Sequence, residues 1–290
     1  MQEYRKYCGA WRAVAAILAI ILPITATSVF AAASVKQEQT ATRALTPLQL
    51  EIEEQRQRLG SAEIEDRREA LARLAAMRHP AASRVALPAL RDPSPIVRAT
   101  AAASVLALPP EESVASLLPL LADKDEFVRQ HAAYALGQAR SRTAVAALVE
   151  RLADKKDSVR GAAAVALGQI ADPAAVIPLS AILTPQSGLA PAKKGQKNKR
   201  ERNPFVLRGA AHSLGQIGHR AGSPALIAVL QDEKAEGDVR REAALAVGVI
   251  GDSAAIPALR EALSARDPHL AQTAHEAIRK ISKSQKAGGI

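Results

Sequence analysis

The side chains that could carry catalysis or bind a metal are few and scattered. The 290-residue chain has six histidines, three tyrosines and one cysteine. A single cysteine cannot form an intramolecular disulfide or a metal site built from several thiolates. The sequence also lacks the HExxH zinc motif, the GxSxG nucleophile motif and a phosphate-binding glycine loop. We therefore predict no catalytic residue, no metal site and no cofactor, and we expect that the chain is not an enzyme.

A set of polar residues recurs at one spacing in three similar segments. The segments begin at residues 128, 159 and 206, and their fourth, seventh and eleventh places fall on one side of a helix. These places hold a row of glutamines with two histidines and a tyrosine: His131, Tyr134, Gln138, Gln169, His212 and Gln216. The row is a candidate binding face. The alternative is an ordinary solvated surface, because glutamine is common on exposed helix faces.

A second pattern places an arginine six residues after an aspartate. It occurs three times at a spacing of 31, as Asp92 and Arg98, Asp123 and Arg129, and Asp154 and Arg160. A guanidinium can bind a carboxylate through two parallel hydrogen bonds. Each arginine could therefore bridge its own aspartate and that of a neighbour, and we interpret the set as a structural ladder between repeats. Leu207 and Ala271 interrupt the ladder in the fifth and seventh repeats.

The strongest concentration of charge lies in residues 185–204. This segment is rich in Gly, Pro, Gln and Asn, which predicts a flexible exposed loop. Six cations against Glu201 give it a net charge of +5: Lys193, Lys194, Lys197, Lys199, Arg200 and Arg202. The segment could attract an acidic partner, or it could be a tolerated solvated insertion. We expect deletion of residues 186–203 to leave the thermal unfolding midpoint nearly unchanged and to weaken salt-sensitive binding.

These candidate residues belong to a pattern that repeats seven times. It begins at residues 66, 97, 128, 159, 206, 239 and 270, with a period near 31 and one spacing of 47 that contains the basic segment. Apolar residues at the first, fifth, sixth, ninth and twelfth places form the stripe of an amphipathic helix. Shorter apolar segments precede five of the repeats, at 113–123, 143–154, 174–184, 223–233 and 253–265. Such helix pairs cannot bury their stripes alone, so we predict an all-α solenoid of about seven stacked pairs.

Composition supports closely packed helices. The chain has 63 alanines, and aromatic residues make up only 2% while hydrophobic residues make up 48%. Strands would favour aromatic and β-branched residues instead. Glycine weakens a helix by about 1 kcal/mol, so the glycines at 137, 168, 215 and 248 predict close approach of a neighbouring helix. Leu167 lies in the middle of the stack, and Leu167→Ala is predicted to cost about 2–5 kcal/mol.

The run D-x-x-x-x-V-R-x-x-A-A-x-A-L-G-x-I, preceded by L-x-x-L-L-x-D, resembles HEAT repeats of the phycobilisome-lyase type. The resemblance covers about residues 47–282 and implies that the second helix of each pair lines a concave face. HEAT-like deoxyhypusine hydroxylases resemble this chain in repeat length and use several His-Glu pairs to hold two irons. This chain has one such pair, His275-Glu276, so we expect that activity to be absent. The resemblance to bilin lyases gains no support from a chain that lacks Cys and Trp after its first residues.

The first residues have the three-part plan of a signal peptide. Within residues 1–33, cations precede an apolar run at 13–24, and small residues follow it. We expect a linker at 34–46, a solenoid at 47–282 and a disordered tail at 283–290, with the chain exported to the periplasm or outside the cell. The alternative is an uncleaved segment from residue 13 to residue 35 that anchors the chain to the inner membrane. A membrane would be a partner only in that case.

Together these features predict a non-catalytic scaffold or adaptor that binds a protein or peptide along the concave face. The alternative is a lyase-like or oxidoreductase-like HEAT enzyme or enzyme accessory. Convergence of His131, Tyr134 and His212 within about 4 Å would favour the enzyme, and an open face would favour binding. Export and the scarcity of aromatic rings argue against a nucleic-acid partner.

Overall fold

The computed structural model describes residues 45–184 and 203–287 of the chain. These residues form fourteen α-helices and short 3-10 turns, and no strand occurs among them. The chain divides into two compact units, Met1–Leu50 and Glu51–Ile290, and the repeats belong to the second. The predicted signal segment and residues 185–202 of the basic segment lie outside the described part. None of the described helices is long and apolar enough to span a bilayer.

Seven long helices are the second members of the predicted pairs. They are α3 (Ile64–Ala76), α5 (Pro95–Ser104), α7 (Glu126–Ala139), α9 (Asp157–Ile170), α11 (Pro204–Ile217), α13 (Gly237–Ile250) and α15 (Pro268–Ala287). Each begins two residues before the place where the sequence pattern starts, so the predicted register of seven repeats is confirmed. The helix α15 continues to Ala287. Residues 283–287, which we expected to be disordered, are therefore helical.

The first members of the pairs are shorter. They are α2 (Pro47–Arg58), α4 (Pro80–Ala86), α6 (Pro110–Leu117), α8 (Val145–Arg151), α10 (Val176–Leu183), α12 (Ser223–Gln231) and α14 (Ile256–Ala262). Thr46 caps α2, because the Gln49 backbone N–H donates to its hydroxyl over 3.3 Å. In return the Thr46 backbone N–H donates to the Gln49 side chain over 2.9 Å. This reciprocal pair satisfies two backbone donors at the helix start.

Two of the first helices end in 3-10 turns because each turn contains a proline. The turn η1 (Leu87–Arg91) follows α4, and η2 (Leu118–Ala122) follows α6. Pro88 and Pro119 are the second residues of these turns. Proline has no N–H to donate to the carbonyl four residues earlier, and its ring clashes with that carbonyl. The α-helix therefore ends, and the chain tightens into i to i+3 turns.

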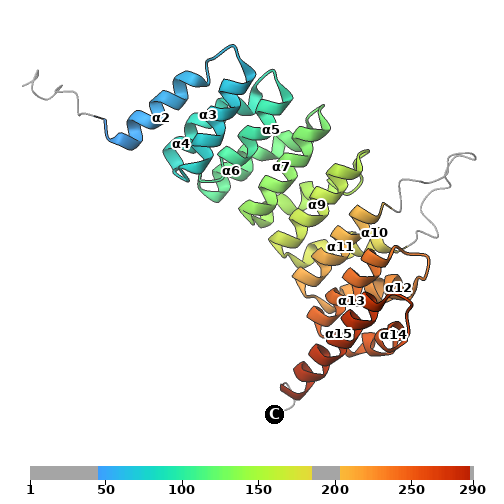
Figure 1. The fold of residues 1–290 in the computed structure, drawn as a ribbon. Coiled ribbons are helices and arrows are strands. Elements are labelled where there is room, and N and C mark those ends of the chain that lie inside the picture. Colours follow the sequence, from blue (N-terminus) through green and yellow to red (C-terminus); the bar gives the residue numbers. More distant parts are fainter. Residues whose placement is uncertain (1–44, 185–202, 288–290) are drawn as a thin grey trace, which may run out of the picture. The chain divides into compact units, whose positions relative to one another are not determined.

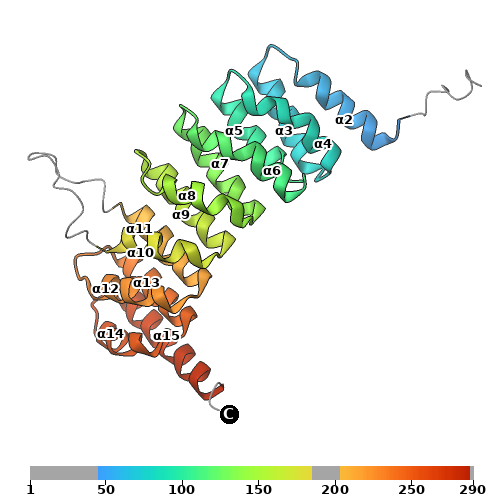
Figure 2. The same ribbon diagram turned by 180° about the vertical axis from the view of Figure 1, so that it is seen from behind.

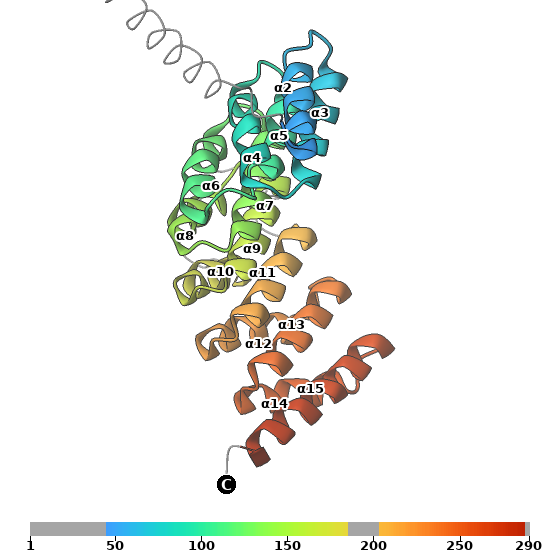
Figure 3. The same cartoon turned by 90° about the vertical axis from the view of Figure 1, so that its left-hand side faces the viewer.

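The second helices pack side by side in chain order. The pairs in contact are α3 with α5, α5 with α7, α7 with α9, α9 with α11, α11 with α13 and α13 with α15 (Figures 1 and 2). The first helices form a second row, in which α10 packs on α12 and α12 on α14 (Figure 3). Leucines fill the space between the rows, and Leu136, Leu167 and Leu214 are at most 1% exposed. The apolar stripe of each repeat is therefore buried against its partner helix and its neighbours.

Small residues set the spacing of the second helices. A Cβ added to Gly137 would lie 2.7 Å from the Ala166 Cα atom, and one added to Gly215 would lie 3.0 Å from the Ala246 Cα atom. Both distances are shorter than ordinary van der Waals contact. The close approach of neighbouring helices that the glycine pattern predicted is therefore confirmed, and it explains why glycine occupies helix positions where its propensity is poor.

Candidate functional site

Among residues 45–184 and 203–287, one face of the second helices is not packed against other helices. In α5, α7, α9, α11 and α13 the first, fifth, sixth and ninth places of the repeat are buried. The fourth, seventh and eleventh places remain exposed or half-buried, with Ala162 as the exception. These are the places of the predicted polar row. We call the surface that they form the free face.

Three residues of the row lie on α7. The ring of His131 is tilted against that of Phe127, with centroids 4.2 Å apart and an angle of 57° between the planes. Burial lowers the pKa of His131, which favours a neutral imidazole. Tyr134 is half-buried against the core, and Gln138 is exposed. The start of the row is therefore an uncharged aromatic patch.

The glutamines of the next two helices lean over glycines. A Cβ added to Gly137 would collide with Gln169 Oε1, and one added to Gly168 would lie 2.5 Å from Gln216 Oε1. Among the described residues, Gln169 Oε1 is buried without a hydrogen-bond partner. Because α7 packs on α9 and α9 on α11, the amides of Gln138, Gln169 and Gln216 stand in one register on three adjacent helices.

The two histidines of the row do not converge. His212 on α11 pairs with Glu242 on α13, with Nδ1 and Oε1 2.8 Å apart. His131 and Tyr134 lie on α7, and α9 packs between α7 and α11 (Figure 1). The structure therefore brings the glutamines into register, but it does not gather His131, Tyr134 and His212 around one point.

The free face continues further than we predicted from the sequence. Leu245 and Val249 on α13 are 40% and 60% exposed. They occupy the seventh and eleventh places of the sixth repeat, the same places as Tyr134 and Gln138 in the third. Comparing the seventh and eleventh places of all seven repeats, instead of three, would have identified Leu245 and Val249 from the sequence. The free face thus carries apolar as well as polar side chains.

The aspartate–arginine ladder joins neighbouring repeats. The Arg98 Nε and Nη2 atoms donate to the Asp123 carboxylate over 2.8 and 2.9 Å. The Arg98 Nη1 atom donates to the backbone carbonyl of Asp92 over 2.8 Å. The predicted bridge from Arg98 to the aspartate of the next repeat is present. The predicted bridge to the aspartate of the same repeat is wrong, because Arg98 binds the backbone carbonyl of Asp92 and not its carboxylate. The pair Arg129 and Asp154 repeats this geometry at 2.9 and 3.0 Å.

The ladder extends beyond the residues that we selected. Arg67 binds Asp92 over 2.8 and 3.1 Å and also donates to the Ser61 carbonyl. Arg67 was missed in the sequence because the residue six places before it is Ser61 and not an aspartate. The structure shows that this place contributes only its backbone carbonyl, so its side chain need not be a carboxylate. Arg160 keeps the backbone contact, to the carbonyl of Asp154 at 3.0 Å, and pairs with Asp157.

The pKa values of the ladder residues agree with a structural role. Burial raises the pKa of Asp123, but hydrogen bonds from Arg98 and from the Asp125 N–H outweigh it and lower the pKa overall. The same balance lowers the pKa of Asp154. The hydrogen bond to Asp123 raises the pKa of Arg98. Both partners are therefore fully charged near neutral pH, and their hydrogen-bonding atoms are engaged within the chain.

The predicted basic residues Lys193 to Arg202 lie outside the described part of the chain. The segment's last residues, Asn203 and Pro204, are described. The Asn203 side chain accepts a hydrogen bond from the Phe205 N–H over 2.9 Å and caps α11. It also donates to Asp157 over 2.6 Å. The end of the insertion is therefore attached to the start of α9.

Comparison with known families agrees with this geometry. The family profile for HEAT repeats matches residues 52–136, 114–189 and 223–287, which is more than half of the chain. The chain belongs to the HEAT-repeat family. Residues 206–232 also match the PBS lyase HEAT-like repeat, the type to which the sequence pattern was similar.

The curated relatives match only part of the chain. Deoxyhypusine hydroxylase of Gallus gallus is 41% identical over 80 residues, which is 27% of this chain and 26% of that protein. Deoxyhypusine hydroxylase-B of Oryza sativa subsp. japonica is 35% identical over 105 residues, 36% of this chain and 34% of that protein. The chain thus matches about a quarter to a third of these relatives' length.

Several solved structures are similar in fold. The complex of CpcE and CpcF of phycocyanin lyase from Nostoc sp. PCC7120 has 22% identity and a TM-score of 0.48, covering 84% of this chain and 90% of that one. Human deoxyhypusine hydroxylase in complex with glycerol has 19% identity and a TM-score of 0.38, covering 81% and 96%. Identities of 22% and 19% with TM-scores below 0.5 indicate a related fold and say nothing about function.

The comparisons correct one expectation. We expected that the chain is not an enzyme, but curated relatives at 35–41% identity are deoxyhypusine hydroxylases, which are enzymes. The chain therefore has enzymatic relatives. The di-iron site that the resemblance implies does not fit the described residues, because it needs several His-Glu pairs and His275-Glu276 is the one pair among them. No three His, Cys, Asp or Glu side chains within the described ranges are placed to share a metal ion.

Proposed function

We propose that this HEAT-repeat chain is a binding scaffold that holds a protein or peptide partner on its free face. The observation that carries the proposal is the register of Gln138, Gln169 and Gln216 on adjacent helices. The Oε1 atom of Gln169 is buried beside Gly137, so a partner reaches the exposed amides of Gln138 and Gln216. These two amides lie on α7 and α11, on either side of α9, and offer donors and acceptors to an extended segment of the partner. Tyr134 at one end and Leu245 at the other add apolar contact area.

The proposal is tested by capture with matched variants. Tyr134→Ala combined with Gln216→Ala alters the free face and is expected to lose most of a partner captured by the wild-type chain. The control combines Ile177→Ala and Gln231→Ala on the first helices, where Ile177 is 79% exposed and Gln231 binds Glu261. The control is expected to retain the partner. Equal capture by both variants would contradict binding at the free face.

An acidic partner and export from the cytoplasm are part of the same proposal. Their support comes from the sequence, where residues 185–204 carry +5 of a total net charge of +10 and residues 1–33 have a signal-peptide plan. Opposite charge raises the association rate and makes it sensitive to salt. Edman sequencing of the chain recovered from its native cell tests the export. A first residue near 32 or 34 supports cleavage, and an intact Met1 contradicts it.

A second candidate is an accessory role for an enzyme. The partial matches to deoxyhypusine hydroxylases favour it. In this case the partner held on the free face is itself an enzyme or its protein substrate. Saturating amounts of the chain are then expected to change the kcat or KM of that enzyme. Unchanged kinetics at full occupancy would contradict the accessory role while leaving the binding scaffold intact.

A further inference from the structure

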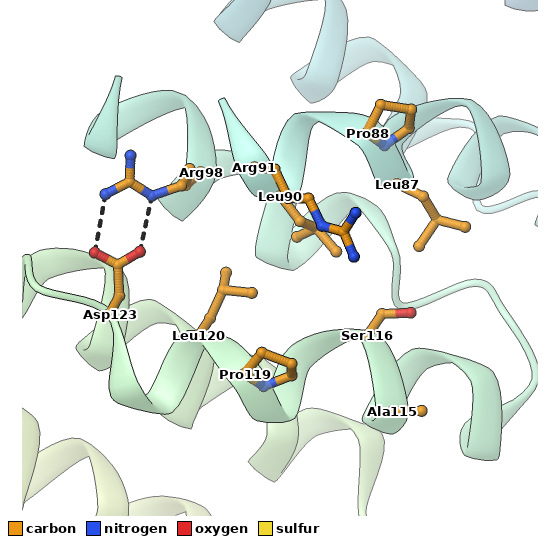
Figure 4. Close-up of a pocket in the computed structure, with 10 residues that line it drawn as sticks. All are labelled: Leu87, Pro88, Leu90, Arg91, Arg98, Ala115, Ser116, Pro119, Leu120 and Asp123. Carbon is orange, nitrogen blue, oxygen red and sulfur yellow. Dashed lines mark hydrogen bonds and ion pairs between the residues drawn. The ribbon is translucent and has the colours of Figure 1, made fainter. Parts of the chain in front are cut away.

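A groove lies on the side of the stack opposite the free face. It separates the first helices of the second and third repeats and has a volume of 760 Å³. Its wall on one side is η1, and on the other η2 with the end of α6 (Figure 4). Pockets that hold ligands generally have volumes of about 300–1,000 Å³. This groove is therefore large enough for several side chains of a partner.

The two proline turns create the groove. Pro88 and Pro119 stand 31 residues apart, at the same place in consecutive repeats, and both line the groove. They end α4 and α6 early and replace each last turn by a narrower 3-10 turn. Two adjacent first helices thus end in 3-10 turns on the same side.

A comparison with the next repeat shows what is missing from the groove. There Arg151 of α8 reaches back over η2, and its Nη1 atom donates to the Leu121 carbonyl over 3.1 Å. The residue 31 places before Arg151 is Leu120, which is shorter and points between the two walls (Figure 4). The space that a guanidinium occupies one repeat later therefore stays open here.

The chemistry of the groove combines apolar walls with one available cation. Leucines and prolines make up half of its lining residues: Leu87, Pro88, Leu90, Pro119 and Leu120. Arg98 lines one end, but its guanidinium is already bound to Asp123 and to two backbone carbonyls. Arg91 is exposed, and its guanidinium projects between the walls (Figure 4). Within the described ranges no carboxylate pairs with Arg91, and the lining carboxylate of Asp123 is bound to Arg98.

We propose that this groove binds an acidic, leucine-rich peptide segment of a protein partner. A carboxylate of the segment binds the Arg91 guanidinium, and apolar side chains flanking it pack on Leu87, Pro88 and Leu120. A charge-assisted hydrogen bond to the exposed guanidinium favours an acid over its amide. The site is separate from the free face, so the two surfaces can engage one partner or two.

The test uses the full chain and two short peptides that differ in one group. The acidic probe is N-acetyl-Leu-Glu-Leu-Leu-amide, and the neutral probe has Gln in place of Glu. The acidic peptide is expected to bind about tenfold more tightly, the effect of one charge-assisted hydrogen bond. In ¹⁵N spectra of the labelled chain, the shifted amides are expected among the non-proline residues of 87–91 and 115–120. Equal affinity for both peptides, or shifts centred on α7 and α9, would overturn the proposal.

Three variants separate the groove from general charge attraction. Arg91→Gln is expected to remove the preference for the acidic peptide, with a loss of about tenfold in affinity. Arg220→Gln removes an equal charge at the exposed start of η5 (Arg220–Gly222) and is expected to change nothing. Ala115→Trp fills the groove from an exposed position and is expected to abolish binding of both peptides. Equal losses from Arg91→Gln and Arg220→Gln, or normal binding by Ala115→Trp with an unchanged unfolding midpoint, would contradict the site.

Discussion

Each ladder arginine makes two kinds of contact with a single side chain. One edge of the Arg98 guanidinium binds the carboxylate of the following repeat, and the remaining nitrogen binds carbonyls at the start of its own helix. The contact therefore closes the turn of one repeat and fixes its neighbour at the same time. The side chains of Arg98 and Asp123 are only 9% and 14% exposed, so water competes weakly for these bonds.

Removing the carboxylate tests the contribution of this contact to stability. Asp123→Asn is expected to lower the free energy of unfolding by about 1.5–3 kcal/mol, the range for hydrogen bonds to charged groups. Urea unfolding followed by circular dichroism measures the loss. Arg84→Gln is the control, because it breaks the exposed pair with Glu112, whose partners are 56% and 37% exposed. The control is expected to lose less than about 1 kcal/mol, and equal losses would contradict the structural role of the ladder.

The ladder also predicts a dependence of stability on pH. The folded-state pKa values of Asp123 and Asp154 are lowered, so these groups stabilise the fold above the unfolded value, about 3.9. That stability is lost as the pH falls through the folded values. The urea midpoint is expected to drop as the pH decreases below about 4, and to drop less in Asp123→Asn combined with Asp154→Asn. An identical decrease in the double variant would refute this assignment.

At the scale of helices, packing distance decides which glycines tolerate a side chain. Gly137→Ala is expected to destabilise the chain although alanine favours helices, because its Cβ would press on the backbone at Ala166. Gly209→Ala is the matched case within α11, since the nearest atom would lie 3.6 Å away. It is expected to stabilise the chain by up to about 1 kcal/mol. The two shifts in thermal midpoint should have opposite signs, and a gain for Gly137→Ala would contradict the close packing of α7 and α9.

The core leucines give a second prediction at this scale. Leu167 is fully buried in α9, and Leu167→Ala is expected to cost about 2–5 kcal/mol because it leaves a cavity. Leu263, which is 41% exposed, serves as control, and Leu263→Ala should change stability by less than about 0.5 kcal/mol. Chemical unfolding of both variants checks this, and a loss below 1 kcal/mol for Leu167→Ala would be inconsistent with a continuous core.

The second helices could be predicted from the sequence because their apolar stripe recurs in every repeat. Val159, Ala163 and Leu167, chosen from the pattern, are all fully buried. The 3-10 turns η1 and η2 were missed because each depends on one proline inside an otherwise helical segment, Pro88 and Pro119. The choice of partner for Arg98 was only half predicted. The partner of Arg98 depends on the distance in space between neighbouring repeats. The residue spacing within one repeat does not give that distance.

At the scale of the whole molecule, stacking leaves two different surfaces available. The free face of the second helices bears the glutamine row, and the binding role of that row stays a prediction. The contact between His212 and Glu242 and the groove beside Arg91 depend on neighbouring repeats and were not predicted. HEAT-repeat membership defines the fold, whereas the partner is determined by the side chains on these surfaces.

Photo-crosslinking at defined positions tests the central claim most directly. The crosslinking residue p-benzoylphenylalanine is placed at Gln216 on the free face, or at Ile177 on the first helices, which is 79% exposed. Both chains are irradiated with the partner that the wild-type chain captures. We predict a crosslinked product from position 216 and none from position 177. A product from position 177 alone would contradict the claim that the free face holds the partner.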